Sequence, residues 1–529
     1  LTGLVAFRQH PDLSLMFEHM GVGQMKGQIQ LSGQLSQPGL LADLQADQLN
    51  VEYAGKRYRA ETVAFNAKAP DLKNAPVQST LKLRQIQGDI PLLAHLQDGI
   101  GQDFQQIDQL DWTLQGQLSS HQSALQLTLN PRQRLNMQVR GAIQSEKDLW
   151  RWQGELSSLQ LSGQPSANLQ APVKLELSEK GLRAGAIRLQ TSLAQIHAET
   201  LEIGKSGLTS NGSVQDIRLI DILQRFRQQT TLSGDLRLQA SWNLRLDDTA
   251  NVQVALKRQS GELRFQDPDG TGASIPAGLK DLQLNIRTAG LISGTDREKL
   301  IADIRAEGSR LGLMQLHAES ALHKREGIWT LAGDQALIGG GSAEIPDLEW
   351  MGPLVYPGLV MKGQLRADVA LAGKLNQPDW KARVRGSKLE LAFASEGLLL
   401  PNGELDADMN GMHLRLNQLS FASVVSMVPQ HSQFKGLDLL GKKGEFRASG
   451  DIDLGKETGS IQASWQQFPL LQRKDRWLVV SGEAGVKESA NIWSLQGKLT
   501  ADGAFFRLPK MPPPSLSSDV IVQNKRTQK

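Results

Sequence analysis

The chain has 529 residues, and its 58 Lys and Arg against 55 Asp and Glu leave a formal net charge of only +3. A balance so close to zero gives no bulk attraction to nucleic acid or to an anionic membrane. Aromatic residues make up 5% of the chain and cysteine is absent. These values disfavour a transmembrane β-barrel with aromatic girdles, and they exclude disulfides, Cys-containing zinc sites and thiol nucleophiles.

The start of the chain carries no recognisable targeting segment. It opens at Leu1 without Met, and no basic stretch is followed by an apolar core. No run approaches the ~18 apolar residues of a membrane-spanning helix. We therefore expect an internal fragment, or a chain from which the targeting segment has been removed.

Apolar side chains recur at every second position along nearly the whole chain. The residues between them are mainly Gln, Arg, Lys, Asn, Thr and Asp. A period of two keeps one face of each strand out of water and the other in it, which predicts antiparallel β-sheet with one wet face. The runs that we take as candidates for the apolar face are, in chain order, Leu81, Leu83; Leu125, Leu127, Leu129; Leu236, Leu238; Val252, Val254; and Leu282, Leu284, Ile286.

Three segments have helical spacing instead: 91–104, 217–226 and 424–428. Asp216 precedes the second segment and Pro429 follows the third, as expected of helix ends. We expect short helices that plug or cap the sheet. They coincide with weak breaks near 91–104, 216–228 and 424–440 in an otherwise continuous β-structure over 1–507.

A short motif, Leu-x-Gly-x-Leu, recurs without a strict period. The variable distances between its copies exclude a tight solenoid of ~20–50-residue repeats. A glycine inside a strand pattern predicts a bend or a close approach of another backbone. The copies are Leu31-Gly33-Leu35, Leu114-Gly116-Leu118, Leu232-Gly234-Leu236, Leu371-Gly373-Leu375 and Leu495-Gly497-Leu499.

So long a sheet cannot remain flat, because strand twist accumulates beyond about ten strands and forces curling, splitting or closure. One solution is an elongated, curled trough with an apolar concave side. The other is a sandwich of two packed sheets. The scarcity of large core-filling residues favours the trough, and the sandwich stays open as a purely structural alternative.

No pattern in the chain predicts catalysis or metal binding. The nine histidines are scattered singly, and none has the spacing that places two imidazoles on one metal ion. Carboxylates are abundant, for example Asp406 and Asp408, but the sequence does not show two of them converging across a cleft. We predict no enzyme, no catalytic residue, no metal and no cofactor. A secreted carbohydrate-binding or carbohydrate-active β-protein stays open as an alternative.

The end of the chain carries the most specific resemblance to a known family. Leu499-Thr500-Ala501-Asp502-Gly503 is followed by the Pro-rich stretch Leu508 to Pro514 and by Leu516-Ser517-Ser518-Asp519-Val520-Ile521-Val522. This segment resembles the TamB family just before its C-terminal domain, where Leu-Pro…Pro-Pro leads into Leu-Ser-x-Asp-Val-x-Val. The Gly-x-Leu units are similar to AsmA-like sheets more broadly.

The resemblance implies a long β-trough that bridges the two membranes of Gram-negative bacteria. Its greasy interior would carry phospholipid toward the outer membrane and support the assembly of outer-membrane proteins and autotransporters. The implied partners are phospholipid, the inner membrane through an N-terminal anchor, and the outer-membrane barrel protein TamA through a C-terminal domain. No nucleic-acid partner is expected.

We expect both the anchor and the C-terminal domain to be absent from this chain. It would then be the periplasmic middle of a protein anchored in the inner membrane. Residues 508–529 would be a Pro-rich segment leading to the absent domain. Under this interpretation, the twelve apolar candidates above line a lipid groove.

Overall fold

The structure is a computed structural model that describes residues 3–12, 22–34, 37–53, 56–71, 75–88, 106–146, 149–205, 207–226, 232–266, 274–325, 327–356, 358–393, 396–430, 437–456, 458–489 and 492–507. It divides into two compact units. Unit 1 is Leu1–Gly341 with Leu371–Pro378, and unit 2 is Ser342–Ala370 with Asp379–Lys529. Both units are nearly all-β and antiparallel, which confirms the predicted fold class.

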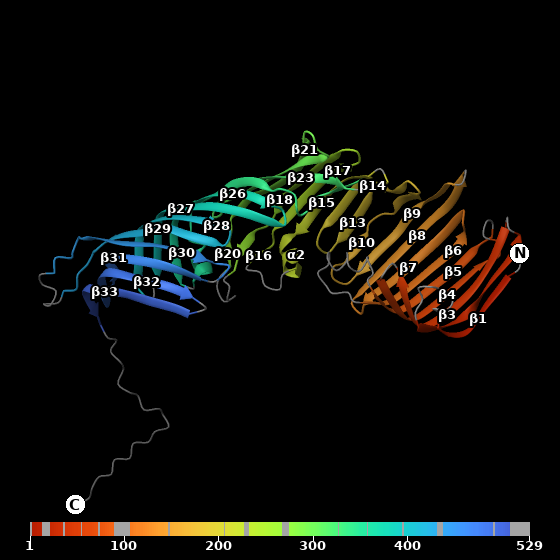
Figure 1. Ribbon diagram of the computed structural model, residues 1–529, viewed down its shortest axis with the longest axis horizontal. Coiled ribbons are helices and arrows are strands. Elements are labelled where there is room, and N and C mark those ends of the chain that lie inside the picture. The colour runs from red at the N-terminus through yellow and green to blue at the C-terminus, as the bar shows by residue number, and fades with distance from the viewer. Residues whose placement is uncertain are drawn as a thin grey trace, which may run out of the picture. The chain divides into compact units, whose positions relative to one another are not determined.

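The first part of unit 1 is a meander in which each strand pairs antiparallel with the next (Figure 1). The alternation of apolar and polar residues makes this pairing favourable, because each strand then adds to one apolar face. The strands are β1 (Gly3–Asp12), β2 (Val22–Gln34), β3 (Gln37–Tyr53), β4 (Lys56–Ala69), β5 (Val77–Gly88), β6 (Gln106–Gln117), β7 (Ser120–Asn130), β8 (Gln133–Glu146) and β9 (Leu149–Ser162).

The next two positions in the sheet of unit 1 are each filled by two short strands. β10 (Ala167–Leu169) and β11 (Val173–Ser178) both pair with β9. β12 (Gly181–Ala184) and β13 (Ile187–Thr191) both pair with β14 (Gln195–Gly204). Pro172 lies in the gap between β10 and β11, where a residue without an N–H cannot extend the ladder.

The meander of unit 1 then continues to the end of that unit. A separate sheet of three short strands and the helix α2 branch from it. β25, β26 and β27 each contribute residues to both units. The elements are β15 (Gly207–Arg218), α2 (Leu219–Phe226), β16 (Leu232–Gly234), β17 (Arg237–Leu246), β18 (Ala250–Ser260), β19 (Leu263–Phe265), β20 (Ile275–Pro276), β21 (Leu279–Leu291), β22 (Arg297–Gly308), β23 (Gly312–Arg325), β24 (Ile328–Thr330), β25 (Ile338–Ile345), β26 (Leu359–Lys374) and β27 (Gln377–Phe393).

The sheet of unit 1 is curled rather than flat. β18 and β24 are four strand steps apart, which would be roughly 19 Å in a flat sheet. Nevertheless the indole N–H of Trp329 in β24 donates to the carbonyl of Asp247, just before β18, at 2.9 Å. Trp329 also belongs to a buried cluster with Ala250 and Leu322. The apolar face is therefore on the inside of this curl.

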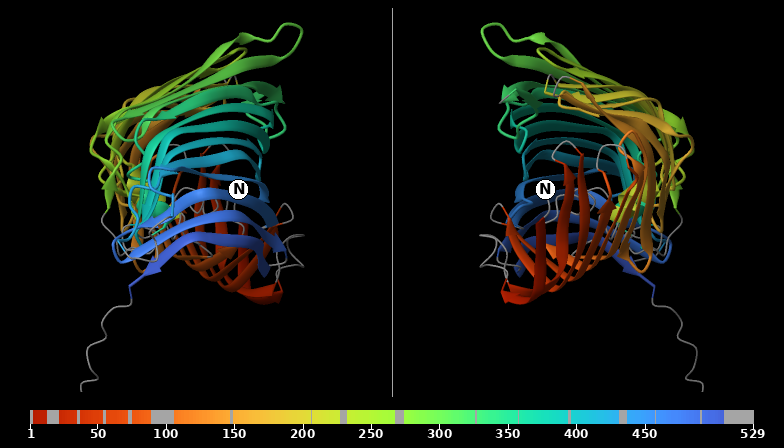
Figure 2. Two further views of the ribbon diagram at one scale, coloured as in Figure 1. Left: turned by 90° about the vertical axis from the view of Figure 1, so that its left-hand side faces the viewer. Right: turned by 90° about the vertical axis from the view of Figure 1, so that its right-hand side faces the viewer.

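Unit 2 repeats the antiparallel meander, and its strands bend into arcs (Figure 2). β28 pairs additionally with β31 at Leu398 and Leu471, past the ends of the two strands between them. The sheet must curl for these two strands to meet. The remaining elements of unit 2 are the one-turn helix α3 (Gly352–Val355), β28 (Leu398–Asn410), β29 (His413–Val424), β30 (Lys443–Asp453), β31 (Thr458–Gln472), β32 (Arg476–Ser489) and β33 (Ile492–Phe506).

The three predicted helices have different outcomes. The helix expected over 217–226 is confirmed as α2, although its first two residues belong to β15. The helix expected over 424–428 is wrong: Val424 ends β29, and 425–430 have no regular secondary structure. The Val425 N–H donates to the Lys442 carbonyl and its side chain is fully buried, so strand-like pairing wins over helical spacing there. Segments 91–104 and 508–529 lie outside the described residues.

The recurring Leu-x-Gly-x-Leu motif marks the ends of strands. Gly33, Gly116, Gly234 and Gly373 have φ of +85°, +115°, +114° and +90°, and each is the last or second-to-last residue of its strand. A Cβ on Gly33 would lie 2.6 Å from the Gln37 carbonyl oxygen across the turn. Glycine is therefore required at these turns by conformation and by space. Gly497 lies in the middle of β33 instead.

Candidate functional site

The apolar face of unit 1 carries a continuous row of side chains across neighbouring strands. Strand pairing fixes the row, because directly opposed residues point to the same face. From β3 to β9 its members are all half-buried. They are Leu44, Phe65, Leu81, Trp112, Leu125, Met137 and Leu159.

A second row crosses the later strands of unit 1 from β14 to β23. Six strand steps of ~4.8 Å make this row roughly 29 Å wide along the sheet. Ile304 is 37% exposed and the other members are half-buried. The row consists of Ile196, Val214, Ala240, Leu256, Leu284, Ile304 and Leu316.

Unit 2 has a row of the same kind from β28 to β33. It ends at Leu495 on β33, which is 73% exposed. Elsewhere in this unit the apolar face is filled by its own side chains, since Leu348, Leu389, Phe421 and Phe468 form a buried cluster. The row is Ala407, Leu416, Gly450, Ile461, Val486 and Leu495.

The twelve predicted groove residues all lie in unit 1 and divide into two groups. Four of them are buried by the chain itself. Leu127 and Leu129 are each 3% exposed in a cluster with Ile107, while Leu236 and Leu238 are 1% and 3% exposed. The other eight are half-buried on the apolar face: Leu81, Leu83, Leu125, Val252, Val254, Leu282, Leu284 and Ile286. Contact of any of the twelve with lipid stays a prediction.

The alternation within β21 is as the sequence predicts. Leu282, Leu284 and Ile286 are half-buried, whereas Gln283, Asn285 and Arg287 are exposed. The apolar and wet faces are thus separated residue by residue.

Tryptophans on the apolar face were not among the predicted groove residues. Each of three indole N–H groups donates to a polar side chain on the same face. Trp112 donates to Ser123 at 2.8 Å, Trp152 to His121 at 2.8 Å and Trp242 to Ser210 at 3.0 Å. With these donors satisfied, the rings add hydrocarbon surface to the apolar face. The sequence could have identified two of them, because Trp112 and Trp242 fall at the apolar positions of the alternation in their strands.

The opposite face of the sheet is covered by cross-strand ion pairs. In unit 1, burial alone would raise the pKa of Asp111, but hydrogen bonds from Arg84 and Gln109 outweigh it and hold that pKa below its usual value. In unit 2, the hydrogen bond from Arg383 to Asp406 at 2.8 Å lowers the pKa of that carboxyl group. These pairs keep the wet face ionised and hydrated.

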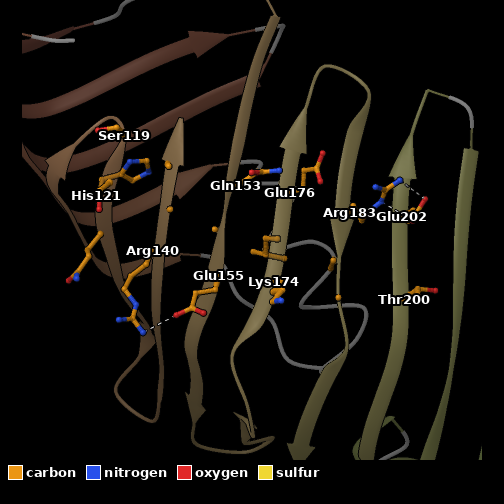
Figure 3. Close-up of a pocket in the computed structure, with 18 residues that line it drawn as sticks. Ser119, His121, Arg140, Gln153, Glu155, Lys174, Glu176, Arg183, Thr200 and Glu202 are labelled. Atoms are coloured by element: carbon orange, nitrogen blue, oxygen red, sulfur yellow. Dashed lines mark hydrogen bonds and ion pairs between the residues drawn. The ribbon is translucent and has the colours of Figure 1, made fainter. Parts of the chain in front are cut away.

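A depression of about 840 Å³ lies on the wet face of unit 1 (Figure 3). It is lined by residues of β7, β8, β9, β11, β12 and β14. Two ion pairs cross it, Arg140–Glu155 at 2.9 Å and Arg183–Glu202 at 2.8 Å. Its lining includes no Trp, Tyr or Phe. Internally neutralised charges without an aromatic platform do not favour a carbohydrate cleft.

Within the described part of the chain, no three His, Asp or Glu side chains are grouped so that they could hold a metal ion. No helix described by the structure is long and apolar enough to cross a membrane.

Comparison with known families agrees with this architecture. The family described as TamB, N-terminal domain, matches residues 6–384. The chain belongs to the TamB family. A second family description, TamB C-terminal domain, matches residues 433–529, which lie in unit 2 and start well before the Pro-rich segment. No curated protein and no solved structure matches the chain.

Membership of the TamB family sets the chain in the context of the translocation and assembly module. That context implies a role in outer-membrane biogenesis. TamB-family proteins act in transport and assembly and are not known as enzymes.

Proposed function

We propose that this TamB-family chain carries phospholipid along the apolar face of its sheet. It acts in the periplasm as part of a bridge that is anchored in the inner membrane and leads toward the outer membrane. TamA is its partner at the outer membrane, and the same bridge supports outer-membrane protein and autotransporter assembly.

One observation supports this proposal most: the side chains of the two apolar rows in unit 1 are half-buried, apart from Ile304, which is 37% exposed. In a closed sandwich, Leu284 and its neighbours in the row would be packed out of contact with solvent. Here the face is inside the curl but retains accessible surface. Such a surface can receive acyl chains, and each methylene group kept from water gains about 0.8 kcal/mol.

The division of the two faces fits the chemistry of a phospholipid. Acyl chains would lie against the leucines and valines of the rows, while the headgroup would stay at the wet edge of the curled sheet. Movement along such a surface needs no catalytic residue, and the apolar contact is similar from one strand to the next.

The proposal predicts that phospholipid co-purifies with the chain and that Leu284→Arg reduces its amount severalfold. A guanidinium without a partner in an apolar groove is unfavourable, so it obstructs the acyl chains or draws in water. Since Leu284 is half-buried, the variant should still fold. Extracted lipid is counted by mass spectrometry, and folding is followed by circular dichroism.

The matched control is Gln283→Arg, which changes the neighbouring exposed residue. It should leave the amount of lipid unchanged. Loss of the fold in Leu284→Arg would favour a sandwich core, and equal lipid in both variants would exclude the groove.

A further inference from the structure

Polar side chains occupy one end of the apolar face on three neighbouring strands of unit 1. They are Thr288 of β21, Glu298 of β22 and Ser320 of β23. Thr288 and Ser320 are both paired with Leu300, which is two residues from Glu298 on the same strand. Because side chains alternate along a strand, all three polar groups share the face of Leu300 and lie close together on it.

Glu298 is the most unusual of the three. Glu298 is only 3% exposed, and its Oε2 atom has no hydrogen-bond partner among the described residues. The hydroxyl oxygen of Ser320, also buried, lacks a partner in the same part of the chain. An unpaired buried polar group costs free energy, and an unpaired buried carboxylate costs more. A ligand that supplies hydrogen-bond donors would remove that cost.

The same three strands become apolar immediately beyond this polar end. Ile286, Ala302 and Ala318 form the next row, and Leu284 with its partners forms the row after that. The face therefore changes from polar to apolar over a few residues, in the way that an amphiphile changes from headgroup to tail.

We propose that Glu298, assisted by Ser320, binds the primary ammonium group of a phospholipid headgroup while the acyl chains lie on the rows beyond it. This inference rests on the proposed function, and it adds selectivity for headgroups that carry a primary amine. The carboxylate of Glu298 accepts hydrogen bonds from the ammonium. The hydroxyl oxygen of Ser320 accepts a further hydrogen bond from the same ammonium group.

The preference among headgroups follows from hydrogen-bond chemistry. A primary ammonium has N–H donors and a positive charge, both of which suit a carboxylate. A trimethylammonium has the charge without any N–H donor. A glycerol headgroup has hydroxyl donors but leaves the lipid with a net negative charge beside Glu298. Ethanolamine lipids should therefore be favoured over choline and glycerol lipids.

Access to Glu298 passes the turn between β17 and β18. Glu298 is paired with Leu322, which belongs to the buried cluster of Ala250 and Trp329. The Asp247 carbonyl in that turn accepts hydrogen bonds from Trp329 and from Lys324, each at 2.9 Å. Breaking these two hydrogen bonds would uncover the polar end of the groove. The turn therefore covers the headgroup site.

The test uses the whole chain and vesicles with equal amounts of ethanolamine, choline and glycerol phospholipids of the same acyl composition. The chain is recovered, and bound lipid is counted by mass spectrometry. We expect ethanolamine lipid to exceed choline lipid about tenfold relative to the vesicles, a factor equivalent to roughly 1.4 kcal/mol. In Glu298→Gln the ratio should fall to within about twofold of the vesicle ratio, while total lipid per chain is unchanged.

The matched control is Glu307→Gln on the opposite face of β22, where Glu307 pairs with Arg305 at 2.8 Å. It should keep the wild-type ratio. An unchanged ratio in Glu298→Gln overturns the headgroup site but leaves lipid carriage intact. Loss of all lipid from folded Glu298→Gln also overturns a selective role. Absence of lipid from the wild-type chain overturns the proposed function itself.

Two further measurements test the headgroup site if Glu298→Gln does not fold. Ser320→Ala should lower the ethanolamine preference about threefold without changing total lipid, and an unchanged ratio counts against the site. Free phosphoethanolamine should not compete with the lipid, because it has no acyl chains. Effective competition would mean that a soluble amine is the ligand and would overturn the lipid assignment.

Discussion

At the residue scale, several glycines of the sheet lie next to an aromatic ring that occupies the space a side chain would need. Gly212 is paired with Trp242, and a Cβ on it would lie 2.7 Å from the Trp242 Cη2 atom. A Cβ on Gly503, which is paired with Val479, would lie 2.5 Å from the Cη2 atom of the diagonal neighbour Trp477. The glycine provides a flat site over which the ring lies, so large and small residues share one layer of the apolar face.

This packing predicts that Gly212→Val destabilises the chain by about 1–3 kcal/mol, since the added side chain meets the His197 carbonyl oxygen and must displace the indole ring. Urea unfolding monitored by tryptophan fluorescence measures the change. The control is Gly185→Ala, where the nearest atom to a new Cβ is the Lys174 Cβ at 3.6 Å. A Gly212→Val chain as stable as the control would refute the packing role.

His317 on the wet face of unit 1 should make stability depend on pH. Its pKa is raised, first by the hydrogen bond with Asp303 at 2.7 Å and then by the one with Glu319 at 3.2 Å. A raised folded-state pKa means that the protonated form is stabilised by folding. That contribution is fully present below the ordinary histidine pKa of 6.5 and is lost as pH rises through the raised value.

The urea midpoint of His317→Gln should therefore fall below that of the wild type at about pH 5.5 and approach it at about pH 9. Asp303→Asn should remove most of the same pH-dependent difference, because it removes the first partner. A constant gap between wild type and His317→Gln at both pH values would show that the ion pairs are too weakly coupled to folding to matter.

At the element scale, the sequence predicts strands well and helices less well. The alternation of Leu282, Leu284 and Ile286 is sufficient to assign the two faces of β21, because a strand has only two sides. Helical spacing over so few residues as 424–428 is ambiguous, and the β-branched Val425 finds a strand-like backbone partner in Lys442. The secondary structure of such short segments is set by pairing with residues that are distant in the sequence. The local pattern carries no information about that pairing.

The candidate site shows the same limit. Parity correctly groups the apolar side chains, but it does not separate half-buried Leu284 from Leu236, which is 1% exposed. The α2 N-terminal N–H of Leu219 donates to the Leu236 carbonyl, so the additional burial there involves a helix returning to the sheet. Glu298 is likewise invisible in the sequence as a special residue, because its burial depends on the curl that brings Trp329 near Asp247.

At the scale of the whole molecule, the two units have related designs. Each is an antiparallel meander that curls so that its apolar face turns inward, and each carries a row of apolar side chains from strand to strand. Unit 2 fills more of that face with its own aromatic side chains, among them Phe421, Phe446 and Phe468. We expect unit 1 to hold the greater share of bound lipid for this reason.

The central claim is that the inward face of the sheet carries phospholipid, and site-specific photo-crosslinking in living cells tests it most directly. A photo-reactive amino acid is placed at position 284 or at position 283, one on each face of β21. Lipid attached to the chain is then measured by mass spectrometry. Strong phospholipid labelling from position 284 with little from position 283 is the predicted result, and equal labelling from the two positions would contradict the groove.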